Sequence, residues 1–203
     1  MTTKQRLLNI FHRLLTTFGR RNWWPGETPL EVIIGAVLTQ NTAWKNVERA
    51  IRNMKQKGLI DLRRLYEIEE AALGNIIKPA GFYNLKSKRL KNIVKVLHND
   101  FQGDLDLMSR MNVNALRTLL LTIDGIGYET ADSILLYALN KPVFVVDAYT
   151  RRFLKNHRLH SGKADYQTIQ AYFMRSLPTD TYLFNEFHAL IVCLAQNYCK
   201  KVP

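Results

Sequence analysis

Apolar residues recur at helical spacing through most of this chain of 203 residues. The set Leu7, Ile10, Phe11 and Leu14 is typical. Residues three and four positions apart share one face of an α-helix, so this spacing marks amphipathic helices that bury one side. The sequence therefore predicts an all-α fold.

Beyond this N-terminal helix, short loops separate the predicted helices. They cover residues 29–40, 43–57, 61–66, 69–77, 84–99, 106–111, 112–121, 128–140, 147–155, 165–176 and 180–198. The segment Lys141 to Val146, KPVFVV, has a strand-like composition. Because no partner strand is visible, we expect an extended connector there.

The charge balance favours a polyanionic partner. The chain holds 29 Lys and Arg against 17 Asp and Glu, a formal net charge of +12. Many proteins are equally basic without binding nucleic acid, so clustering matters more than the total. Two predicted helices carry such clusters: Lys86, Lys88, Arg89, Lys91 and Lys95, and Arg151, Arg152, Lys155 and Arg158. Both could form basic faces for a phosphate backbone.

Other classes of protein are disfavoured. A membrane span needs about 20 uninterrupted apolar residues, and no stretch approaches that length. The amphipathic N-terminus lacks the compact apolar run of a signal peptide. We therefore expect a cytoplasmic protein, associated with the nucleoid in a prokaryote, and no membrane partner. Cys193 and Cys199 are spaced for different faces of one helix, so a disulfide framework is not expected.

A glycine pair marks a tight turn between two predicted helices. Gly125 and Gly127 flank Ile126, and a helix begins near Tyr128. Such a turn leaves backbone N–H groups open to a phosphate, although an ordinary glycine-capped helix turn has the same pattern. The context is more specific, because Asp147 follows 20 residues after Gly127, at the end of the run PVFVV and before AYTRRFLK.

The segment IDGIGYETADSILLYALNKPVFVVDAYTRRFLK resembles the helix-hairpin-helix, Gly/Pro-rich loop and Asp signature (HhH-GPD) of the endonuclease III superfamily of DNA glycosylases. LEVIIGAVLTQNTAWKNVERAI resembles the family's early helix with its LTQNT segment, and IIKPAGFYNLKSKRL resembles its mid-chain segment. The resemblance covers nearly the whole chain in the expected order.

The resemblance implies two helical subdomains flanking a DNA-binding cleft. Residues 24–133 would form the central subdomain, with the hairpin motif at about 112–140, and residues 1–23 plus 134–203 the second. The partner would be double-stranded DNA containing a damaged base, bound by a monomer that flips the base out of the stack. The expected DNA contacts are Gly125, Ile126, Gly127, Gln40, Lys86, Lys88 and Arg151.

Gln40, in the LTQNT position, would fill the gap that the flipped base leaves. The alternative for this residue is a polar cap at a helix end. Asp147 would be the catalytic carboxylate, which stabilises the positive charge that develops on the sugar or activates a water molecule. It also fits an N-cap of the following helix, and both roles are compatible.

The family's glycosylase/lyases place a lysine just after the hairpin, where this chain has Glu129. A carboxylate cannot form a Schiff base, so we expect a monofunctional enzyme that uses water. Glu129, together with the WWP segment, resembles the 3-methyladenine glycosylase branch, which removes alkylated purines. The alternative for Glu129 is an acid in a first helical turn, without a role in substrate choice.

This branch would need an aromatic base pocket, because cationic alkylated purines are attracted to ring faces. The candidate pocket residues are Trp23, Trp24, Pro25, Trp44 and Glu129. Core packing is the alternative for each tryptophan.

The chemistry requires no cofactor. HALIVCLAQNYCKKVP matches the helix that leads to the first cysteine of the family's [4Fe-4S] loop, here Cys199. Cys199 would be a metal ligand only if such a loop followed Pro203, since a cluster needs about four thiolates.

Two other functions remain open. One is an endonuclease III-like glycosylase and abasic-site lyase that acts on oxidised pyrimidines through another lysine. The other is a non-catalytic DNA-binding module that uses only the hairpin.

Overall fold

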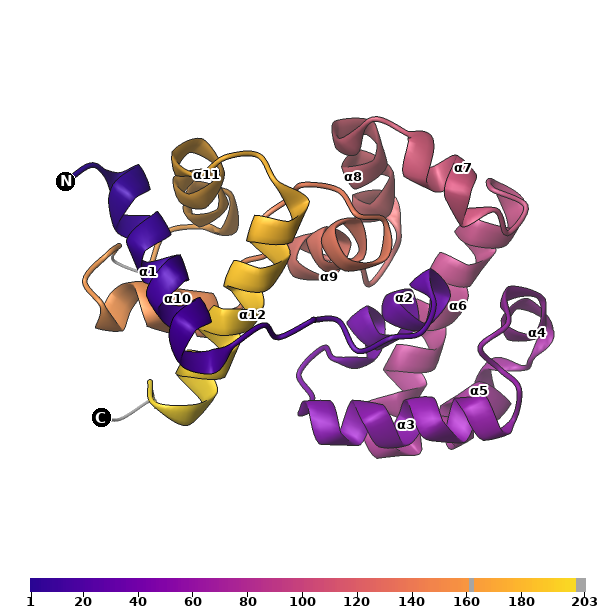
Figure 1. The fold of residues 1–203 in the computed structure, drawn as a ribbon. Helices are drawn as coiled ribbons and strands as arrows, with labels where there is room; N and C mark the ends of the chain where they lie inside the picture. Colours follow the sequence, from indigo (N-terminus) through magenta and orange to yellow (C-terminus); the bar gives the residue numbers. More distant parts are fainter. Residues whose placement is uncertain (161–162, 200–203) are drawn as a thin grey trace. The chain divides into compact units, whose positions relative to one another are not determined.

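The computed structural model describes residues 1–160 and 163–199 (Figure 1). These residues form helices joined by loops, without a β-strand in the described ranges, so the all-α prediction is confirmed. None of the described helices is both long enough and apolar enough to cross a membrane. The chain divides into two compact units, a terminal unit of residues 1–24 and 140–203 and a central unit of residues 25–139.

The second division lies after Leu139, whereas the sequence predicted it after residue 133. Helix α9 (Tyr128–Ser133) runs directly into a π-helical turn, η2 (Ile134–Ala138), which packs on α2 (Pro29–Leu38). The predicted boundary was thus inside a continuous helical stretch. Because η2 packs on α2 of the central unit, the boundary between the two units falls after this helical stretch and does not divide it.

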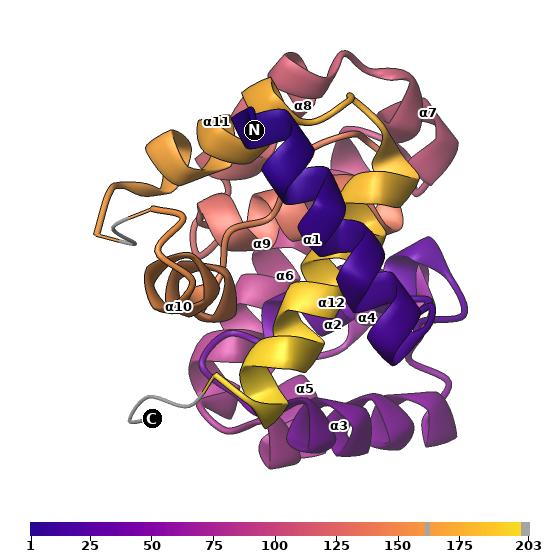
Figure 2. The ribbon, with the colours of Figure 1, turned by 60° about the vertical axis from the view of Figure 1, so that its left-hand side comes forward.

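The terminal unit contains α1 (Thr3–Phe18), α10 (Ala148–Asn156), α11 (Tyr166–Ser176) and α12 (Thr181–Asn197). Helix α12 is its centre and packs against α1 and α10. Figure 2 shows α1 running beside α12. Leu7 and Phe11 of α1 are buried, and the Phe11 ring meets Phe187 of α12 edge-on at 5.5 Å. The predicted periodicity of α1 is therefore that of a helix packed on one side.

The connector 141–146 contains neither helix nor strand, and the predicted extended course is interrupted at its start by a tight turn in which Val143 N donates to Lys141 O at 2.8 Å. Its apolar side chains are buried within the terminal unit. The Phe144 ring stacks on Phe173 with centroids 4.0 Å apart, and it meets Phe184 edge-on at 5.7 Å. The segment has a strand-like composition because it crosses an aromatic core.

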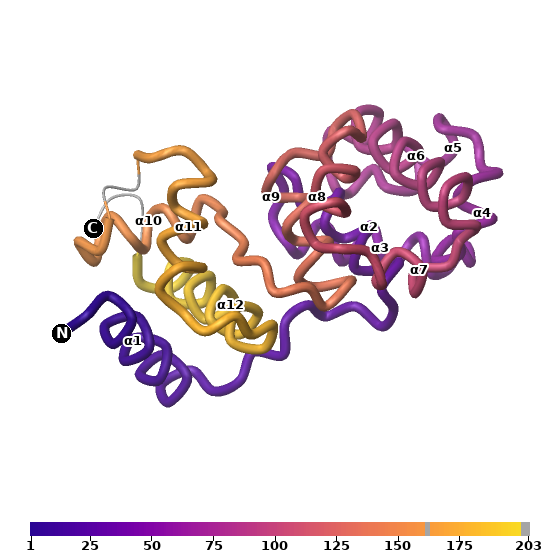
Figure 3. Tube along the Cα trace, turned by 90° about the horizontal axis from the view of Figure 1, so that it is seen from above, coloured from indigo at the N-terminus to yellow at the C-terminus, as the bar shows by residue number. Residues whose placement is uncertain are grey.

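The central unit contains α2, α3 (Trp44–Gln56), α4 (Leu62–Glu67), α5 (Glu70–Ile76), the 3₁₀ turn η1 (Lys78–Ala80), α6 (Tyr83–Asn99), α7 (Leu105–Arg110), α8 (Val113–Thr122), α9 and η2. Helix α6 packs against α2, α4 and α5, and Figure 3 shows α4, α5 and α6 lying together. The N-cap side chains of Thr28, Asp61 and Asn112 accept hydrogen bonds from the first turns of their helices. Local sequence therefore sets where these helices begin.

Candidate functional site

The predicted hairpin joins α8 to α9 in the central unit, and its two glycines have different environments. Gly125 has φ +90°, and a Cβ there would lie 2.3 Å from Arg89 Cγ. Gly127 has φ −91°, and a Cβ there would meet nothing within 4 Å. The fold itself therefore requires glycine at 125. At Gly127 it does not, but the open face would let a ligand approach the backbone closely.

The third hairpin residue points inward. Ile126 is buried, and its N–H donates to Ile123 O at 3.0 Å. Its side chain anchors the turn to the central unit. The N–H groups of Gly125 and Gly127 donate to no residue within the described ranges.

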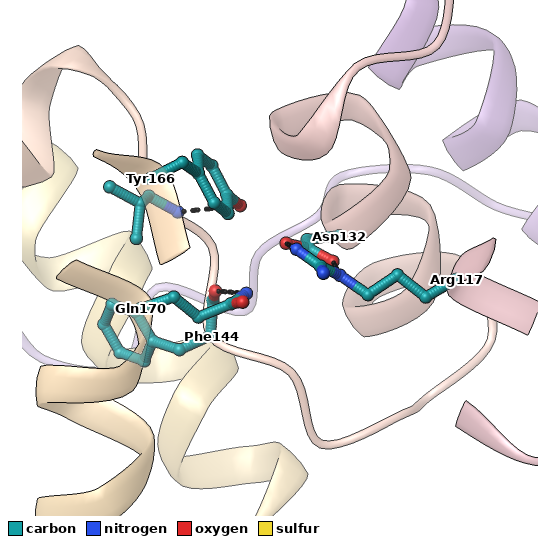
Figure 4. A network of polar contacts seen from close by, with 6 residues as sticks. Arg117, Asp132, Phe144, Tyr166 and Gln170 are labelled. Carbon is teal, nitrogen blue, oxygen red and sulfur yellow. Dashed lines mark hydrogen bonds and ion pairs between the residues drawn. The ribbon is translucent and has the colours of Figure 1, made fainter. Parts of the chain in front are cut away.

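An ion pair ties the two hairpin helices together. Arg117 of α8 donates to both carboxylate oxygens of Asp132 of α9, at 2.6 and 2.9 Å (Figure 4). Asp132 is fully buried, and the Arg117 guanidinium also lies over the Tyr128 ring, 5.1 Å from its centroid. This forked pair is strong and directional. It was not predicted from the sequence, although the two charges lie on helices that face each other across the predicted turn.

Gln40, two residues after the end of α2, is directed at the hairpin. Its Nε2 donates to Gly125 O at 3.0 Å and to Thr130 Oγ1 at 2.9 Å, and its Oε1 accepts from the Arg89 guanidinium. Both ends of the amide are thus engaged inside the central unit. Its role as a wedge in DNA stays a prediction.

Lys86 was expected on an exposed basic face, and the structure contradicts this. The side chain is buried, and its ammonium donates to Leu38 O and Ala80 O, each at 2.8 Å, and to Thr42 Oγ1 at 2.5 Å. Burial, with a smaller contribution from the positive charge of Arg89, lowers the pKa of Lys86 to about 8. A long lysine stem allows the residue to sit among apolar side chains while its head reaches backbone oxygens.

The other lysines of the predicted basic cluster on α6 also differ in their environments. Lys91 donates to the carbonyls of Leu65, Tyr66 and Ile68 beside the end of α4, and burial lowers its pKa. Lys88 is exposed, with its ammonium 4.0 Å from the Asp124 carboxylate. Only part of the cluster therefore faces solvent, and a DNA contact at Lys88 stays a prediction.

Asp147 begins α10 in the terminal unit. Its carboxylate accepts from Thr150 N at 2.7 Å, so it is the N-cap that the sequence predicted. The other oxygen lies 3.6 Å from His188 Nε2 of α12, and the two side chains are 14% and 7% exposed. Burial alone would raise the pKa of Asp147. The charge of His188 and the hydrogen bond from Thr150 N outweigh it, so the pKa of Asp147 is lowered from its usual 3.8.

Two side chains of α11 fix the connector that leads to Asp147 (Figure 4). Gln170 Nε2 donates to Phe144 O at 2.7 Å, and Val146 N donates to Tyr166 Oη at 3.3 Å. These two hydrogen bonds satisfy backbone groups of the connector that no helix or sheet pairs. Neither contact was predicted from the sequence. The approach of His188 to Asp147 was not predicted either.

Arg151, the other predicted phosphate contact, is half-buried and donates to Ala164 O at 2.6 Å. Its neighbour Arg152 donates to Ala195 O at 2.6 Å. Lys155 and Arg158 are exposed. The outward charge of α10 is therefore concentrated towards its C-terminal end, and contact of Arg151 with DNA stays a prediction.

The predicted base pocket draws on both units. Trp23 and Trp24 belong to the terminal unit, with ring centroids 5.2 Å apart at 53°. Pro25, Trp44 and Glu129 belong to the central unit. The indole N–H of Trp44 donates to the Glu48 carboxylate, one turn later in α3, at 2.6 Å. Glu129 is exposed in the first turn of α9. A pocket made by these five residues stays a prediction.

Cys199 is buried, with Sγ 3.5 Å from His157 Nε2, and burial raises the pKa of its thiol. Within the described ranges, no group of three or more His, Cys, Asp or Glu side chains is arranged to hold a metal ion. The [4Fe-4S] loop, which the sequence allows only beyond Pro203, lies outside the described residues.

The positive charge is unevenly shared. The terminal unit contains 14 Lys and Arg against 4 Asp and Glu, and the central unit contains 15 against 13. Most of the net charge therefore belongs to the unit that carries Asp147, and the hairpin unit is nearly neutral.

Comparison with known proteins identifies the class to which this fold and hairpin belong. Residues 34–179 match the family model described as HhH-GPD superfamily base excision DNA repair protein. The chain therefore belongs to the HhH-GPD superfamily of base excision DNA repair proteins.

Individual relatives agree with this assignment. A Methanocaldococcus jannaschii protein with the provisional name DNA repair glycosylase is 46% identical over 199 residues, 97% of this chain and 90% of that protein. The crystal structure of H. pylori 3-methyladenine DNA glycosylase (MagIII) bound to 1,N6-ethenoadenine has a TM-score of 0.83 and 30% identity, covering 98% of this chain and 100% of the other. A non-covalent endonuclease III–DNA complex also has a TM-score of 0.83 at 18% identity, covering 100% and 90%, which shows the shared fold.

Proposed function

We propose that this DNA repair glycosylase is monofunctional and hydrolyses the N-glycosidic bond of a damaged, alkylated purine flipped out of duplex DNA. The observation that carries the proposal is the state of Asp147, a nearly enclosed carboxylate held ionised by His188 and Thr150. Such a group stabilises the positive charge that develops on the sugar, and a water-poor setting strengthens this effect. It can equally take a proton from the attacking water.

The hairpin supplies the expected hold on DNA. The N–H groups of Gly125 and Gly127 have no acceptor within the described part of the chain, and Gly127 leaves its backbone open. Backbone N–H groups bind a phosphate whatever the base sequence, which suits an enzyme that searches duplex DNA for lesions.

Two side chains support a water nucleophile over a lysine. Glu129 stands where the family's lyases have lysine, and it is exposed on α9. Lys86 has a lowered pKa, but all three donors of its ammonium are used by internal oxygens. The product would then be an abasic site in an uncut strand.

The alkylated purine is the finer part of the proposal. Adjacent Trp23 and Trp24 offer two electron-rich rings, which attract a cationic base. The identified relative with a bound base is a 3-methyladenine DNA glycosylase, which agrees with this class of lesion.

Asp147→Asn tests the chemistry. Asparagine also caps helices well, so the fold should persist while the charge is lost. We expect base release to fall on the order of 10²–10⁴-fold with DNA affinity largely retained. Asp165→Asn is the matched control, since Asp165 is an exposed N-cap that accepts from Thr168 N at 2.7 Å. Undiminished turnover by Asp147→Asn would refute the assignment.

The alternatives are separated by two further measurements. Borohydride trapping of a covalent protein–DNA complex would indicate a lyase that uses another lysine. A release assay over alkylated, oxidised, deaminated and mismatched bases identifies the lesion. Absence of release from every substrate would favour a non-catalytic DNA-binding module.

A further inference from the structure

Helix α6 directs two cations towards loops of its own unit. Lys86 and Arg89 lie three residues apart, which places them on neighbouring positions of one helix face. Neither forms an ion pair with a carboxylate within the described ranges. Their partners are instead oxygen atoms of loops and loop side chains.

Lys86 joins two loops, residues 39–43 and residues 78–82. Its ammonium contacts Thr42 Oγ1 in the first loop and Ala80 O in the second, as well as Leu38 O at the end of α2. Thr42 Oγ1 itself donates to Ala80 O at 2.6 Å. An ammonium has three N–H donors, and each has an acceptor here. The negative end of the α2 dipole offsets part of the cost of burying the charge.

Arg89 joins the first of these loops to the hairpin. It donates to Gln40 Oε1, and Gln40 Nε2 donates to Gly125 O and Thr130 Oγ1. Asn92, three residues further along α6, donates to Asp124 O at 3.1 Å. One face of α6 thus holds three separate segments of the central unit.

Each of the three segments exposes a residue that nothing in the unit covers. The 39–43 loop exposes Asn41, with φ +52°, and the hairpin exposes Gly127. The 78–82 loop ends at Phe82, 69% exposed with φ +46°. A bulky residue in left-handed backbone is strained, so the surroundings must hold it there.

We propose that Lys86 and Arg89 are positioning residues that lock the 39–43 loop, the 78–82 loop and the hairpin into one preformed DNA-binding edge. This inference rests on the proposed function for the identity of the ligand. Both cations act through the loops, without touching DNA. A preformed edge binds more tightly because its loops need not be ordered on binding.

Lys86→Met tests the first bridge, since it removes the charge and keeps an apolar stem. Lys57→Met, which removes an exposed lysine elsewhere in the central unit, is the matched control. Binding of an undamaged duplex is measured over a series of salt concentrations, well below the unfolding temperature. We expect Lys86→Met to weaken binding about fivefold or more, as the loss of about 1 kcal/mol implies, with an unchanged slope of log K against log salt. A slope smaller by about 0.9 would mean that Lys86 itself binds a phosphate and would overturn the proposal.

Hydrogen exchange provides a readout that needs no DNA. In Lys86→Met, amide exchange should accelerate in residues 39–43 and 78–82 and remain unchanged in α12. Thr42→Val, which keeps the shape and removes one acceptor, should give the same pattern if Lys86→Met fails to fold. Unchanged exchange in both loops, or acceleration throughout the chain, would overturn the proposal.

Arg89→Met should weaken binding in the same way, and Arg89→Lys should restore it by keeping a cation for Gln40. Failure of the lysine variant to bind better than the methionine variant would contradict the second bridge. Base release is measured separately on the wild-type protein. Loss of the proposed activity would therefore not be mistaken for failure of the loop network.

Discussion

At the scale of single residues, the ionisation of Asp147 is decided by opposing effects. Burial favours the neutral acid, while His188 and Thr150 favour the carboxylate and prevail. Because the folded pKa lies below the usual 3.8, Asp147 stabilises the fold above that pH. This contribution disappears as the pH falls through the folded pKa. At neutral pH the group is thus ready to act as an anion.

Replacing His188 should reverse this balance. In His188→Gln the favourable interaction of His188 with the carboxylate is lost while burial remains, so we expect the pKa of Asp147 to rise. The acid limb of kcat/KM for base release should then move to higher pH, which a pH–rate profile measures. His12→Gln, at an exposed position, is the control. An acid limb that stays in place in His188→Gln would show that another group holds the carboxylate.

The two hairpin glycines allow a matched pair of alanine variants. Gly125→Ala combines φ +90° with a Cβ 2.3 Å from Arg89 Cγ, so we expect a loss of stability of about 1–3 kcal/mol. Gly127→Ala has room for its methyl group and should change stability by less than about 0.5 kcal/mol. Its DNA affinity should nevertheless fall, because the methyl group would occupy the approach to the backbone. Urea unfolding and duplex binding separate the two effects, and full affinity in Gly127→Ala would exclude close DNA contact there.

At the scale of elements, the hairpin depends on the pairing of α8 with α9. Asp132 has no solvent exposure, so loss of its partner leaves a buried charge. We expect Arg117→Met to lower the free energy of unfolding by about 3 kcal/mol, measured by urea denaturation. Arg63→Met removes an exposed pair with Glu67 and should cost less than about 1 kcal/mol. Equal effects of the two variants would mean that the buried pair does not hold the hairpin.

The helices themselves were largely predictable, because apolar period and N-caps are properties of neighbouring residues. Residues 141–146 form a connector without helix or strand, but the tight turn at Pro142 was not predicted. The helix predicted at 128–140 matches α9 and η2 together, but the π-helical form of Ile134–Ala138, which packs on α2, was not predicted. Nothing in the local sequence distinguishes that turn from ordinary helix.

At the scale of the whole molecule, charge and hairpin belong to different units. The terminal unit carries most of the net positive charge. The central unit, which contains the hairpin and its backbone N–H groups, is nearly neutral. We therefore expect the salt dependence of DNA binding to come mainly from the terminal unit.

Neutralising Lys155 and Arg158 together tests this division. Both are exposed on or just after α10. The double glutamine variant should reduce the slope of log K against log salt by about 0.9 for each phosphate that the protein no longer neutralises. The control is Arg63→Gln in the central unit, which is already paired with Glu67 and should leave the slope unchanged. A smaller slope in Arg63→Gln, together with an unchanged slope in the double variant, would place the electrostatic contacts in the central unit.

The sequence by itself determined the helices, the glycine turn and Asp147 as the N-cap of a basic helix, because each depends on residues close together in the chain. Only the tertiary structure decided which cations face solvent and which partner holds each polar group. Lys86 and Lys88 have the same charge two positions apart, yet one is buried and the other exposed. His188 likewise reaches Asp147 only because α12 packs on α10. The environment of a side chain depends on the segments packed against it, and those segments cannot be identified from the residues next to it in the sequence.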